Sequence, residues 1–259
     1  MQTNFDQAAS TYDATFTHTK IGRAQRDIVY EHITRLLSHP PKDILEINCG
    51  TGEDAIWFEK RGFNVLATDI SSEMIARAKS KMNSTSIEFV QADINQVSEQ
   101  FSTKKFDVVF SNFGGLNCLT ATELEQFFLK VQKILSDKGR LILVIMPKNT
   151  LWEKLYFILK GKGKEAFRRT KEVAFAKVEG AIVPTYYYNP KDIERLAHDN
   201  FERLESKPIG FFIPPSYLEP FFKKRPRLFQ LLVQWEKKIR NKSALSKYSD
   251  HYLLVLQKR

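Results

Sequence analysis

Short apolar runs and longer amphipathic stretches alternate along residues 43–147. Five of these runs are rich in Val, Ile, Leu and Phe and have the length and composition of buried strands. They cover residues 43–47, 64–69, 87–93, 106–112 and 140–146. Between them, apolar residues recur every three or four positions, which predicts helices. Strands that alternate with helices indicate repeated βαβ units, and therefore a parallel sheet with helices on both faces.

The helix after the fourth strand carries the clearest boundary signals. Thr120 and Glu123 form a capping box at its start. Its apolar face is expected to run as far as Leu135, and Gly139 is expected to end it before the fifth strand. The sequence therefore places this helix between about residues 121 and 138.

The regular alternation stops after Pro147. Two more strands, near residues 201–212 and 252–256, are expected to join the same sheet, with a hairpin or irregular strand pair before them. A late helix is expected to have an apolar face, which consists of Leu228, Leu231, Leu232, Trp235 and Ile239. We therefore predict a doubly wound α/β fold with a mostly parallel seven-stranded sheet, an N-terminal helical cover and an aromatic and basic C-terminal insert.

Charge and composition also change at about Pro147. Residues 1–147 have a net charge of −2, whereas residues 148–259 have a net charge of +12 and hold 18 of the 32 aromatic residues. With 42% hydrophobic and 27% charged residues, the chain has the composition of a folded globular protein. No apolar run approaches the roughly 20 residues of a spanning helix, and the polar start does not resemble a signal peptide, so the cytoplasm is expected. Two cysteines without metal-ligand spacing predict neither a disulfide scaffold nor a metal.

The residues that carry chemistry begin with Gly50 and Gly52, which lie between the first strand and the next helix. Such glycines allow a sharp turn and let a ligand lie against bare backbone. Asp69 ends the second strand, where an acidic side chain can accept both hydroxyls of a ribose. Together these residues predict a nucleoside cofactor, although a glycine pair alone also fits a structural turn.

The loop differs from the fingerprint of a nicotinamide dinucleotide site. That fingerprint requires G-x-G-x-x-G, whereas Asn48 stands in the first glycine position and Asp54 lies near the third. Glu53 and Asp54 at the helix start would repel a pyrophosphate. A cofactor without phosphates that carries an ammonium group and a sulfonium fits this acidic opening better.

At this point the sequence resembles the class I S-adenosylmethionine-dependent methyltransferases, and the resemblance covers residues 5–146. Glu46, Asn48, Gly50 and Gly52 occupy the family pattern of an acidic residue followed by x-G-x-G-x-G, with Asn48 in place of the first glycine. Asn also tolerates positive φ, so this departure is mild. The resemblance implies S-adenosylmethionine as cofactor and S-adenosylhomocysteine as product.

The same resemblance implies a role for each residue that matches a motif. The Gly50 loop would support the methionine part of the cofactor, Asp69 would hold the ribose hydroxyls, and Ile70 would lie beside the adenine. Asp93 would read the adenine amino group, with Ile94 next to it. Taken alone, Asp93 also fits the role of a turn cap.

Two further segments match the family. Asn112 and Phe113, after the fourth strand, look like the segment beside the transferring methyl, and the opening F-D-x-x-A-x-x-Y-D is similar to that of small-molecule methyltransferases. By that resemblance Tyr12 would line the cofactor site, and Arg23 or Arg26 would meet the cofactor carboxylate. Taken singly, Tyr12 also fits a packing aromatic and the two arginines fit solvated helix positions.

These assignments divide the chain into three parts of one compact domain. Residues 1–40 form the helical cover, and Pro40 with Pro41 breaks the chain after a helix that spans about residues 20–38. Residues 41–147 form the Rossmann-like cofactor core. Residues 148–259 form the substrate cap and the last strands.

The acceptor is predicted only as a class. A small, apolar or anionic metabolite is favoured, because no [DNS]-P-P-[YFW] motif or Pro-Cys pair for base methylation occurs. An RNA or protein methyltransferase that uses the basic half, and a non-catalytic protein that binds S-adenosylmethionine, are the alternatives. The spacing identifies neither the oligomeric state nor a catalytic base. The candidate bases are His18, His198, His251, Tyr186, Tyr187 and Tyr188.

Overall fold

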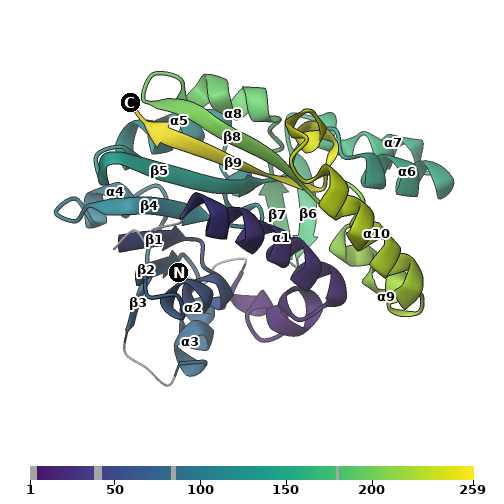
Figure 1. Ribbon diagram of the computed structural model, residues 1–259, viewed down its shortest axis with the longest axis horizontal. Coiled ribbons are helices and arrows are strands. Elements are labelled where there is room, and N and C mark those ends of the chain that lie inside the picture. The colour runs from purple at the N-terminus through teal and green to yellow at the C-terminus, as the bar shows by residue number, and fades with distance from the viewer. Residues whose placement is uncertain (1–4, 38–42, 83–85, 179–180) are drawn as a thin grey trace.

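The computed structural model describes residues 5–37, 43–82, 86–178 and 181–259. Its centre is a seven-stranded sheet with the strand order β3-β2-β1-β4-β5-β9-β8 (Figure 1). Only β9 runs antiparallel to its neighbours β5 and β8, so the sheet is mostly parallel, as the sequence predicts. The strands are β1 (Asp43–Ile47), β2 (Asn64–Asp69), β3 (Ile87–Gln91), β4 (Phe106–Ser111), β5 (Leu135–Ile145), β8 (Phe201–Ile209) and β9 (His251–Lys258).

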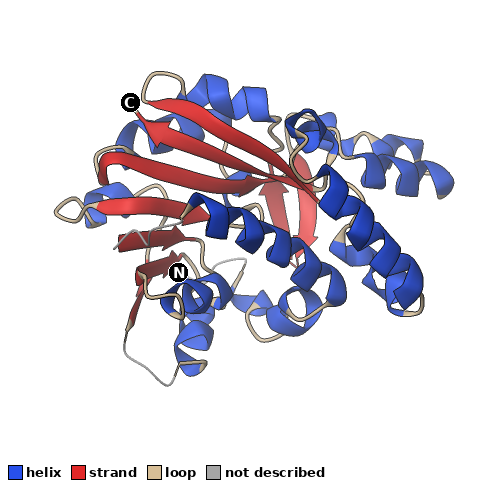
Figure 2. Cartoon of the chain, in the orientation of Figure 1, coloured by secondary structure: helices blue, strands red, loops and turns tan. Residues whose placement is uncertain are grey.

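Helices cover both faces of this sheet (Figure 2). One face packs against α1 (Lys20–Leu36), α2 (Glu53–Glu59), α3 (Ser72–Ser80), α9 (Glu219–Lys223) and α10 (Pro226–Ile239). The other face packs against α4 (Val97–Gln100), α5 (Ala121–Val131) and α8 (Pro190–Ala197). Side chains alternate between the two cores along each strand: Ile142 and Val144 of β5 face the first, and Leu141 and Leu143 face the second.

The remaining elements lie at the ends of the sheet. The N-terminal cover begins with η1 (Asp6–Ala8) and η2 (Asp13–Thr17) ahead of α1, and the predicted break at Pro40 and Pro41 lies outside the described residues. After β5 come α6 (Leu151–Leu159), α7 (Gly163–Ala166) and η4 (Arg168–Thr170). The predicted hairpin is confirmed as β6 (Ala174–Val178) and β7 (Ala181–Thr185), a separate two-stranded sheet. The short turns η3 (Gly115–Cys118), η5 (Ser216–Leu218) and η6 (Ser243–Tyr248) complete the chain.

The predicted end of the helix after the fourth strand is wrong. The capping box of Thr120 and Glu123 is present, but α5 ends at Val131, and both Leu135 and Gly139 lie in β5. Leu135 continues the helical spacing of the residues before it and is fully buried, so the pattern does not distinguish a helix from a strand there. A register shift where β4 and β5 pair, with Lys138 at φ +61°, accommodates the extra residues.

The apolar face predicted for the last helix is also only partly correct. Leu232 is buried, but Leu228, Leu231 and Trp235 remain about 40% exposed. The buried face of α10 contains Phe229 and, unexpectedly, a charged residue, Glu236.

In the part of the chain that the structure describes, the helices are too short or too polar to span a membrane.

Candidate functional site

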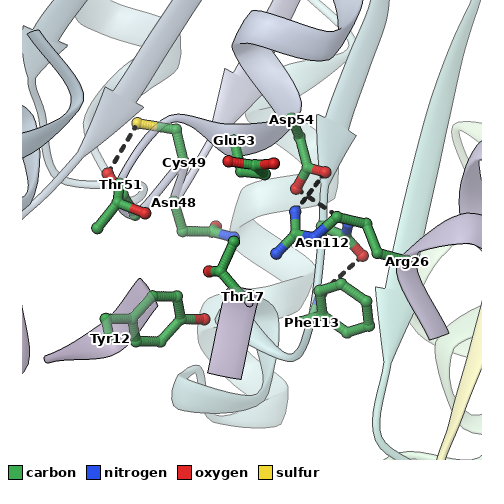
Figure 3. Close-up of a pocket in the computed structure, with 11 residues that line it drawn as sticks. Tyr12, Thr17, Arg26, Asn48, Cys49, Thr51, Glu53, Asp54, Asn112 and Phe113 are labelled. Atoms are coloured by element: carbon green, nitrogen blue, oxygen red, sulfur yellow. Dashed lines mark hydrogen bonds and ion pairs between the residues drawn. The ribbon is translucent and has the colours of Figure 1, made fainter. Parts of the chain in front are cut away.

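The carboxyl ends of β1, β2 and β4 lie side by side and bring three loops together. Because these strands are parallel neighbours, the residues that follow Ile47, Asp69 and Ser111 meet at one edge of the sheet. Asn48 Nδ2 donates a hydrogen bond of 2.9 Å to Ser111 Oγ, which ties the first loop to the end of β4. This edge holds a cavity, shown in Figure 3. Its walls are formed by Tyr12, Thr17, Arg26, Asn48, Cys49, Gly50, Thr51, Glu53, Asp54, Asn112 and Phe113.

The two glycines of the first loop serve different purposes. Gly50 has φ +53°, and a β-carbon built there would meet only the ring of Tyr12, at 3.8 Å, so its backbone is open to the cavity. Gly52 has φ +78°, and a β-carbon there would lie 2.9 Å from atoms of Ala78 and Phe89. Gly50 therefore exposes backbone to a ligand, whereas Gly52 lets α2 pack closely on its neighbours. Asn48 has φ +50°, which confirms the expected positive φ.

Asp69 organises the loop. One carboxylate oxygen accepts from the Gly50 N–H at 2.8 Å and the other from the Ser71 N–H at 2.9 Å. Burial raises the pKa of Asp69, and these backbone hydrogen bonds partly oppose that rise. A carboxylate has about four acceptor positions, so Asp69 retains acceptor capacity for ligand hydroxyls.

A buried ion pair forms one wall of the cavity. Arg26 pairs with Asp54, which also accepts hydrogen bonds from Tyr30 Oη at 2.7 Å and from Asn112 Nδ2 at 3.0 Å. Burial alone would lower the pKa of Arg26, but Asp54 raises it above the ordinary value. The guanidinium carbon of Arg26 lies 5.0 Å from the centre of the Phe113 ring. The sequence predicts an acidic site entrance formed by Glu53 and Asp54. The positive charge of Arg26 offsets the negative charge of Asp54, so this entrance is less acidic than expected.

Four buried polar atoms around this cavity have no hydrogen-bond partner among the described residues. They are Arg26 Nε, Glu46 Oε2, Asn48 Oδ1 and Thr17 Oγ1, a hydroxyl that can donate or accept. Burial, with the nearby charge of Asp54, raises the pKa of Glu46 well above its ordinary value. One unpaired donor and two unpaired acceptors match a ligand that carries both a carboxylate and an ammonium group.

The N-terminal cover closes over the cavity through ring contacts and polar contacts. The rings of Tyr12 and Phe16 lie 5.7 Å apart, and those of Phe16 and Phe113 lie 5.0 Å apart. Thr51 Oγ1 donates to Asp13 Oδ1 at 2.6 Å, which joins the cover to the glycine loop. Burial raises the pKa of Tyr12 to about 12, so its hydroxyl remains a neutral hydrogen-bonding group.

The structure brings together some of the residues predicted for the site and leaves others apart. Tyr12, Asn48, Gly50, Asn112 and Phe113 line the cavity, and Glu46, Gly52 and Asp69 belong to the strand ends and loop behind it.

The other four predicted site residues do not line the cavity. Arg23 is exposed, and Arg26, one helical turn later, lines the cavity instead. Ile70 is exposed, and Ile94 packs against the second core. Asp93 accepts a hydrogen bond from the Asn95 N–H at 2.9 Å, as a turn cap does.

Sequence reasoning missed Tyr30, Thr17 and Thr51 as parts of the site. Tyr30 stacks on Trp57 with ring centres 4.0 Å apart and reaches Asp54 from the middle of α1. Its helical position gives no sign of this role. For Thr51 the sequence did hold a signal: Asp13 belongs to the opening motif, and Asp13 accepts the hydrogen bond from Thr51 Oγ1.

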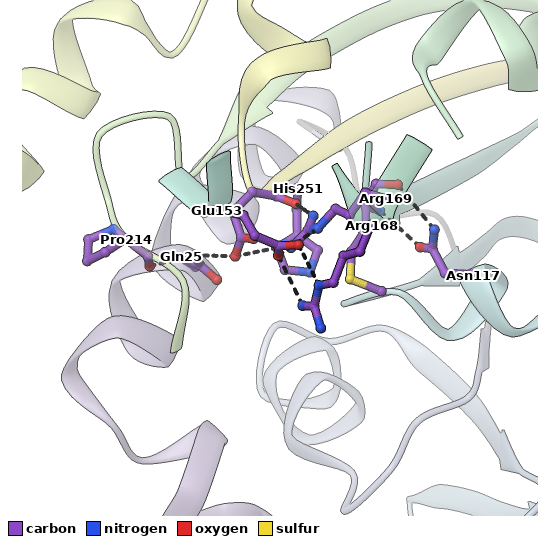
Figure 4. Close-up of polar contacts among 9 residues, drawn as sticks. Gln25, Asn117, Glu153, Arg168, Arg169, Pro214 and His251 are labelled. Atoms are coloured by element: carbon purple, nitrogen blue, oxygen red, sulfur yellow. Dashed lines mark hydrogen bonds and ion pairs between the residues drawn. The ribbon is translucent and has the colours of Figure 1, made fainter. Parts of the chain in front are cut away.

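A second polar cluster contacts Phe113 through the ring of His251, and Figure 4 shows His251 together with Glu153, Arg168 and Arg169 of this cluster. The rings of Phe113 and His251 are 5.4 Å apart, and His251 Nδ1 lies 3.3 Å from Asp250 Oδ2. Burial would raise the pKa of Asp250, but His251 and Arg169 hold it well below its usual range. Arg169 also pairs with Glu153, at 2.9 Å.

This cluster separates the candidate bases by position. His18 and His198 are exposed, whereas His251 is the histidine that lies against a wall of the cavity. The Tyr188 hydroxyl donates to the Leu119 carbonyl, and burial raises the pKa of Tyr187. No group of three or more His, Cys, Asp or Glu residues that could hold a metal occurs in the part of the chain that the structure describes.

Comparisons with known proteins agree on one class. Residues 44–139 match the family model described as a methyltransferase domain. The chain is 30% identical over 159 residues to the malonyl-(acyl-carrier protein) O-methyltransferase of Anoxybacillus flavithermus, which covers 59% of this chain and 55% of that protein. It is 29% identical over 107 residues to the tRNA 5-carboxymethoxyuridine methyltransferase of Escherichia coli (strain K12), with 39% and 41% covered. The chain spans about half the length of the curated relatives it matches.

Solved structures show the same fold. The crystal structure of magnesium protoporphyrin IX methyltransferase from Synechocystis PCC 6803 with bound SAH aligns with a TM-score of 0.58 and 17% identity, covering 92% of this chain and 85% of that one. The fold is thus the Rossmann-like methyltransferase fold. Residues 44–139 match a methyltransferase domain, and the chain as a whole is similar to methyltransferases of this fold.

Proposed function

We propose that this protein binds S-adenosylmethionine and transfers its methyl group to a small, apolar or anionic metabolite. The observation that carries the proposal is the set of unpaired polar atoms beside the open backbone of Gly50. Arg26 Nε would donate to the cofactor carboxylate, and Glu46 and Asn48 would accept from its ammonium group. Asp69 would accept from the ribose hydroxyls with its remaining acceptor positions.

The bound cofactor would supply an already activated methyl group on a sulfonium. The protein would then act mainly by positioning, because in-line transfer needs the acceptor atom within roughly 3–3.5 Å of the methyl and on its axis. Asn112 and Phe113, which follow the end of β4, line the cavity, and the Phe113 ring also contacts the ring of His251. We place the methyl acceptor on the side of Phe113 that faces His251. We also propose that the protein is located in the cytoplasm.

Binding tests the cofactor site. Gly50→Val should weaken S-adenosylmethionine binding by about a hundredfold or more, because the side chain would enter the cavity beside Tyr12. The measurement is isothermal titration with S-adenosylmethionine, S-adenosylhomocysteine and NAD. Wild-type protein that binds NAD and ignores both adenosyl compounds would refute the proposal.

Gly62→Val is the matched control for this variant. Gly62 also has a positive φ, of +84°, and nothing lies within 4 Å of a β-carbon built there. Both variants therefore carry backbone strain, but only Gly50→Val blocks the cavity. Equal loss of binding in the two variants would show that strain, and not the site, is responsible.

The basic C-terminal half supports a second candidate, an RNA methyltransferase. Residues 148–259 carry a net charge of +12, and one relative by name methylates a tRNA nucleoside. This candidate expects RNA affinity that falls steeply with salt. Binding that is absent at low salt would count against it, and turnover to S-adenosylhomocysteine with any acceptor would exclude a non-catalytic role.

A further inference from the structure

Two segments that project from the molecule differ sharply from the rest in charge. We name them the basic arms: the first is residues 151–171, with α6 and α7, and the second is residues 219–242, with α9 and α10. The arms hold 15 Lys and Arg residues against four Asp and Glu residues, a net charge of +11. The remaining residues hold 25 against 26, so the arms contain the whole excess.

The acidic residues of the arms barely reduce this charge at the surface. Glu153 and Glu236 are buried. Glu219 accepts hydrogen bonds from the first two backbone N–H groups of α1. Glu165 is the one acidic residue of the arms that is classed as exposed. Arg168 and Arg169 pair with Glu153, but eleven of the other Lys and Arg residues of the arms are exposed, so the outer surface of the arms is mostly positive.

The arms also hold most of the large apolar side chains that are exposed among the described residues. Nine of the 15 large apolar side chains that are exposed among the described residues lie in these two segments. They are Leu151, Leu155, Ile158, Leu159, Phe167, Phe221, Leu228, Leu231 and Trp235. Soluble monomeric proteins seldom gather apolar residues in this way without a partner.

These apolar residues form stripes on the helices. On α6, Leu155, Ile158 and Leu159 are 51%, 55% and 77% exposed, and with Leu151 they follow the i, i+4, i+7, i+8 spacing of one helix face. On α10, Leu228, Leu231 and Trp235 follow the i, i+3, i+7 spacing. Each helix therefore turns an apolar stripe to solvent, and exposed basic residues lie near it.

Contacts hold the two arms together at one end of the molecule. The Trp152 ring packs edge-on against Phe222 with ring centres 6.0 Å apart. The Tyr156 ring lies 5.3 Å from that of Tyr217, which is in η5 directly before the second arm. Trp152 Nε1 also donates to the Phe212 carbonyl, at 3.1 Å. In Figure 1 both arms extend beyond the right-hand end of the sheet.

That end of the sheet is also where the cavity lies. The first arm follows the carboxyl end of β5, and the second follows the carboxyl end of β8. Because β5 and β8 both run antiparallel to β9, their carboxyl ends are at the same edge as those of β1 and β4. Whatever binds the arms therefore lies at the same edge of the sheet as the cavity.

We propose that the basic arms dock the protein on an anionic lipid bilayer. The exposed aliphatic stripes would enter the interface between headgroups and acyl chains, while the lysines and arginines beside them meet anionic headgroups. RNA fits less well, because bases stack on aromatic and arginine side chains and the α6 stripe is aliphatic. Docking would bring an amphiphilic acceptor to the edge of the sheet that holds the cavity.

The test is co-sedimentation of the full chain with vesicles. Phosphatidylcholine–phosphatidylglycerol vesicles should bind the protein at low salt, and pure phosphatidylcholine vesicles should bind it at least about tenfold more weakly. Raising the salt should weaken the first interaction. Absence of binding to the anionic vesicles at low salt would overturn the proposal.

Two double variants examine the apolar and the charged contributions. Leu155→Glu/Ile158→Glu and Lys223→Glu/Lys224→Glu should each lower binding to the anionic vesicles by about tenfold or more. The first variant removes apolar area that docking would bury in the bilayer, and the second reverses the charge that meets the headgroups. All four residues are exposed, so the fold should be retained, as circular dichroism would check.

Matched variants on other surfaces are the controls. Leu129→Glu/Leu204→Glu changes exposed apolar residues of α5 and β8, and a Lys60→Glu/Lys191→Glu variant changes exposed lysines of other helix ends. Both should bind vesicles as the wild type does, and equal losses in arm and control variants would refute the proposal. Binding of RNA or an acidic carrier protein through the arms, without vesicle binding, would also refute it. The experiment needs no cofactor, so its outcome is independent of the proposed methyl transfer.

Discussion

At the residue scale, the site depends on side chains whose polar atoms are buried and only partly paired. Arg26 uses part of its guanidinium on Asp54 and leaves Nε without a partner. A buried donor of this kind costs free energy unless a ligand satisfies it. Arg26 therefore has two separable roles: it neutralises Asp54 and it presents a donor to the cavity.

Two variants separate these roles of Arg26. Arg26→Leu should lower the free energy of unfolding by about 3–5 kcal/mol, because it leaves Asp54 buried without its cation. Arg26→Leu/Asp54→Leu should recover part of that stability, because Tyr30 and Asn112 lose their acceptor, but should still bind S-adenosylmethionine at least about tenfold more weakly than wild type. Urea unfolding and isothermal titration would measure the two effects. Wild-type affinity in the stable double variant would contradict the donor role.

At the scale of elements, one carboxylate joins α10 to the chain after β8. Glu236 is fully buried and accepts hydrogen bonds from the backbone N–H groups of Gly210, Phe211, Phe212 and Ile213. Burial raises the pKa of Glu236, and these four donors oppose the rise. The contact explains why a charged residue replaces an apolar one on the buried face of α10.

Glu236→Gln should destabilise the protein by about 2–4 kcal/mol. The amide nitrogen of Gln cannot accept, so at least one pair of buried N–H groups would lose its acceptor. Thermal and urea unfolding would show the effect, and Lys238→Ala, an exposed change on the same helix, should stay within about 0.5 kcal/mol of wild type. A Glu236→Gln variant as stable as wild type would mean that these hydrogen bonds contribute little.

At the scale of the whole molecule, a buried carboxyl at the end of β1 links stability to pH. Burial raises the pKa of Glu46 well above 4.5. Below pH 4.5 both the folded and the unfolded chain keep this proton. As the pH rises above 4.5 the unfolded chain loses it first, so this group makes the folded state progressively less stable up to its own raised pKa.

Glu46→Gln removes this titration. The stability of the variant relative to wild type should therefore increase with pH above about 4.5, by at most roughly 1.4 kcal/mol per pH unit. Urea unfolding at a series of pH values would measure the difference. Curves that stay parallel from pH 4 to pH 8 would contradict a raised pKa for Glu46.

Much of the fold could be predicted from the sequence, because strand and helix periodicities are local. The ranges of β1 and β2 are confirmed, as are the capping box of α5 and the addition of the last two strands to the sheet. The end of α5 could not be predicted, since Leu135 fits both a helix face and a buried strand. Leu135 is part of the sheet because it pairs with Phe106 of β4, and the local sequence does not reveal this distant partner.

The site divides in the same way. Local sequence determined the positive φ of Asn48, the Gly50 loop and Asp69 after its strand, because each requirement is met within a few residues. Only the tertiary structure decided that Arg26, and not Arg23, reaches the cavity, and that Asp54 is paired and not free. It also decided that the apolar stripes of α6 and α10 face solvent. Whether a side chain is buried or paired depends on residues that are distant in the chain. A local sequence pattern does not contain the distance between a side chain and such residues.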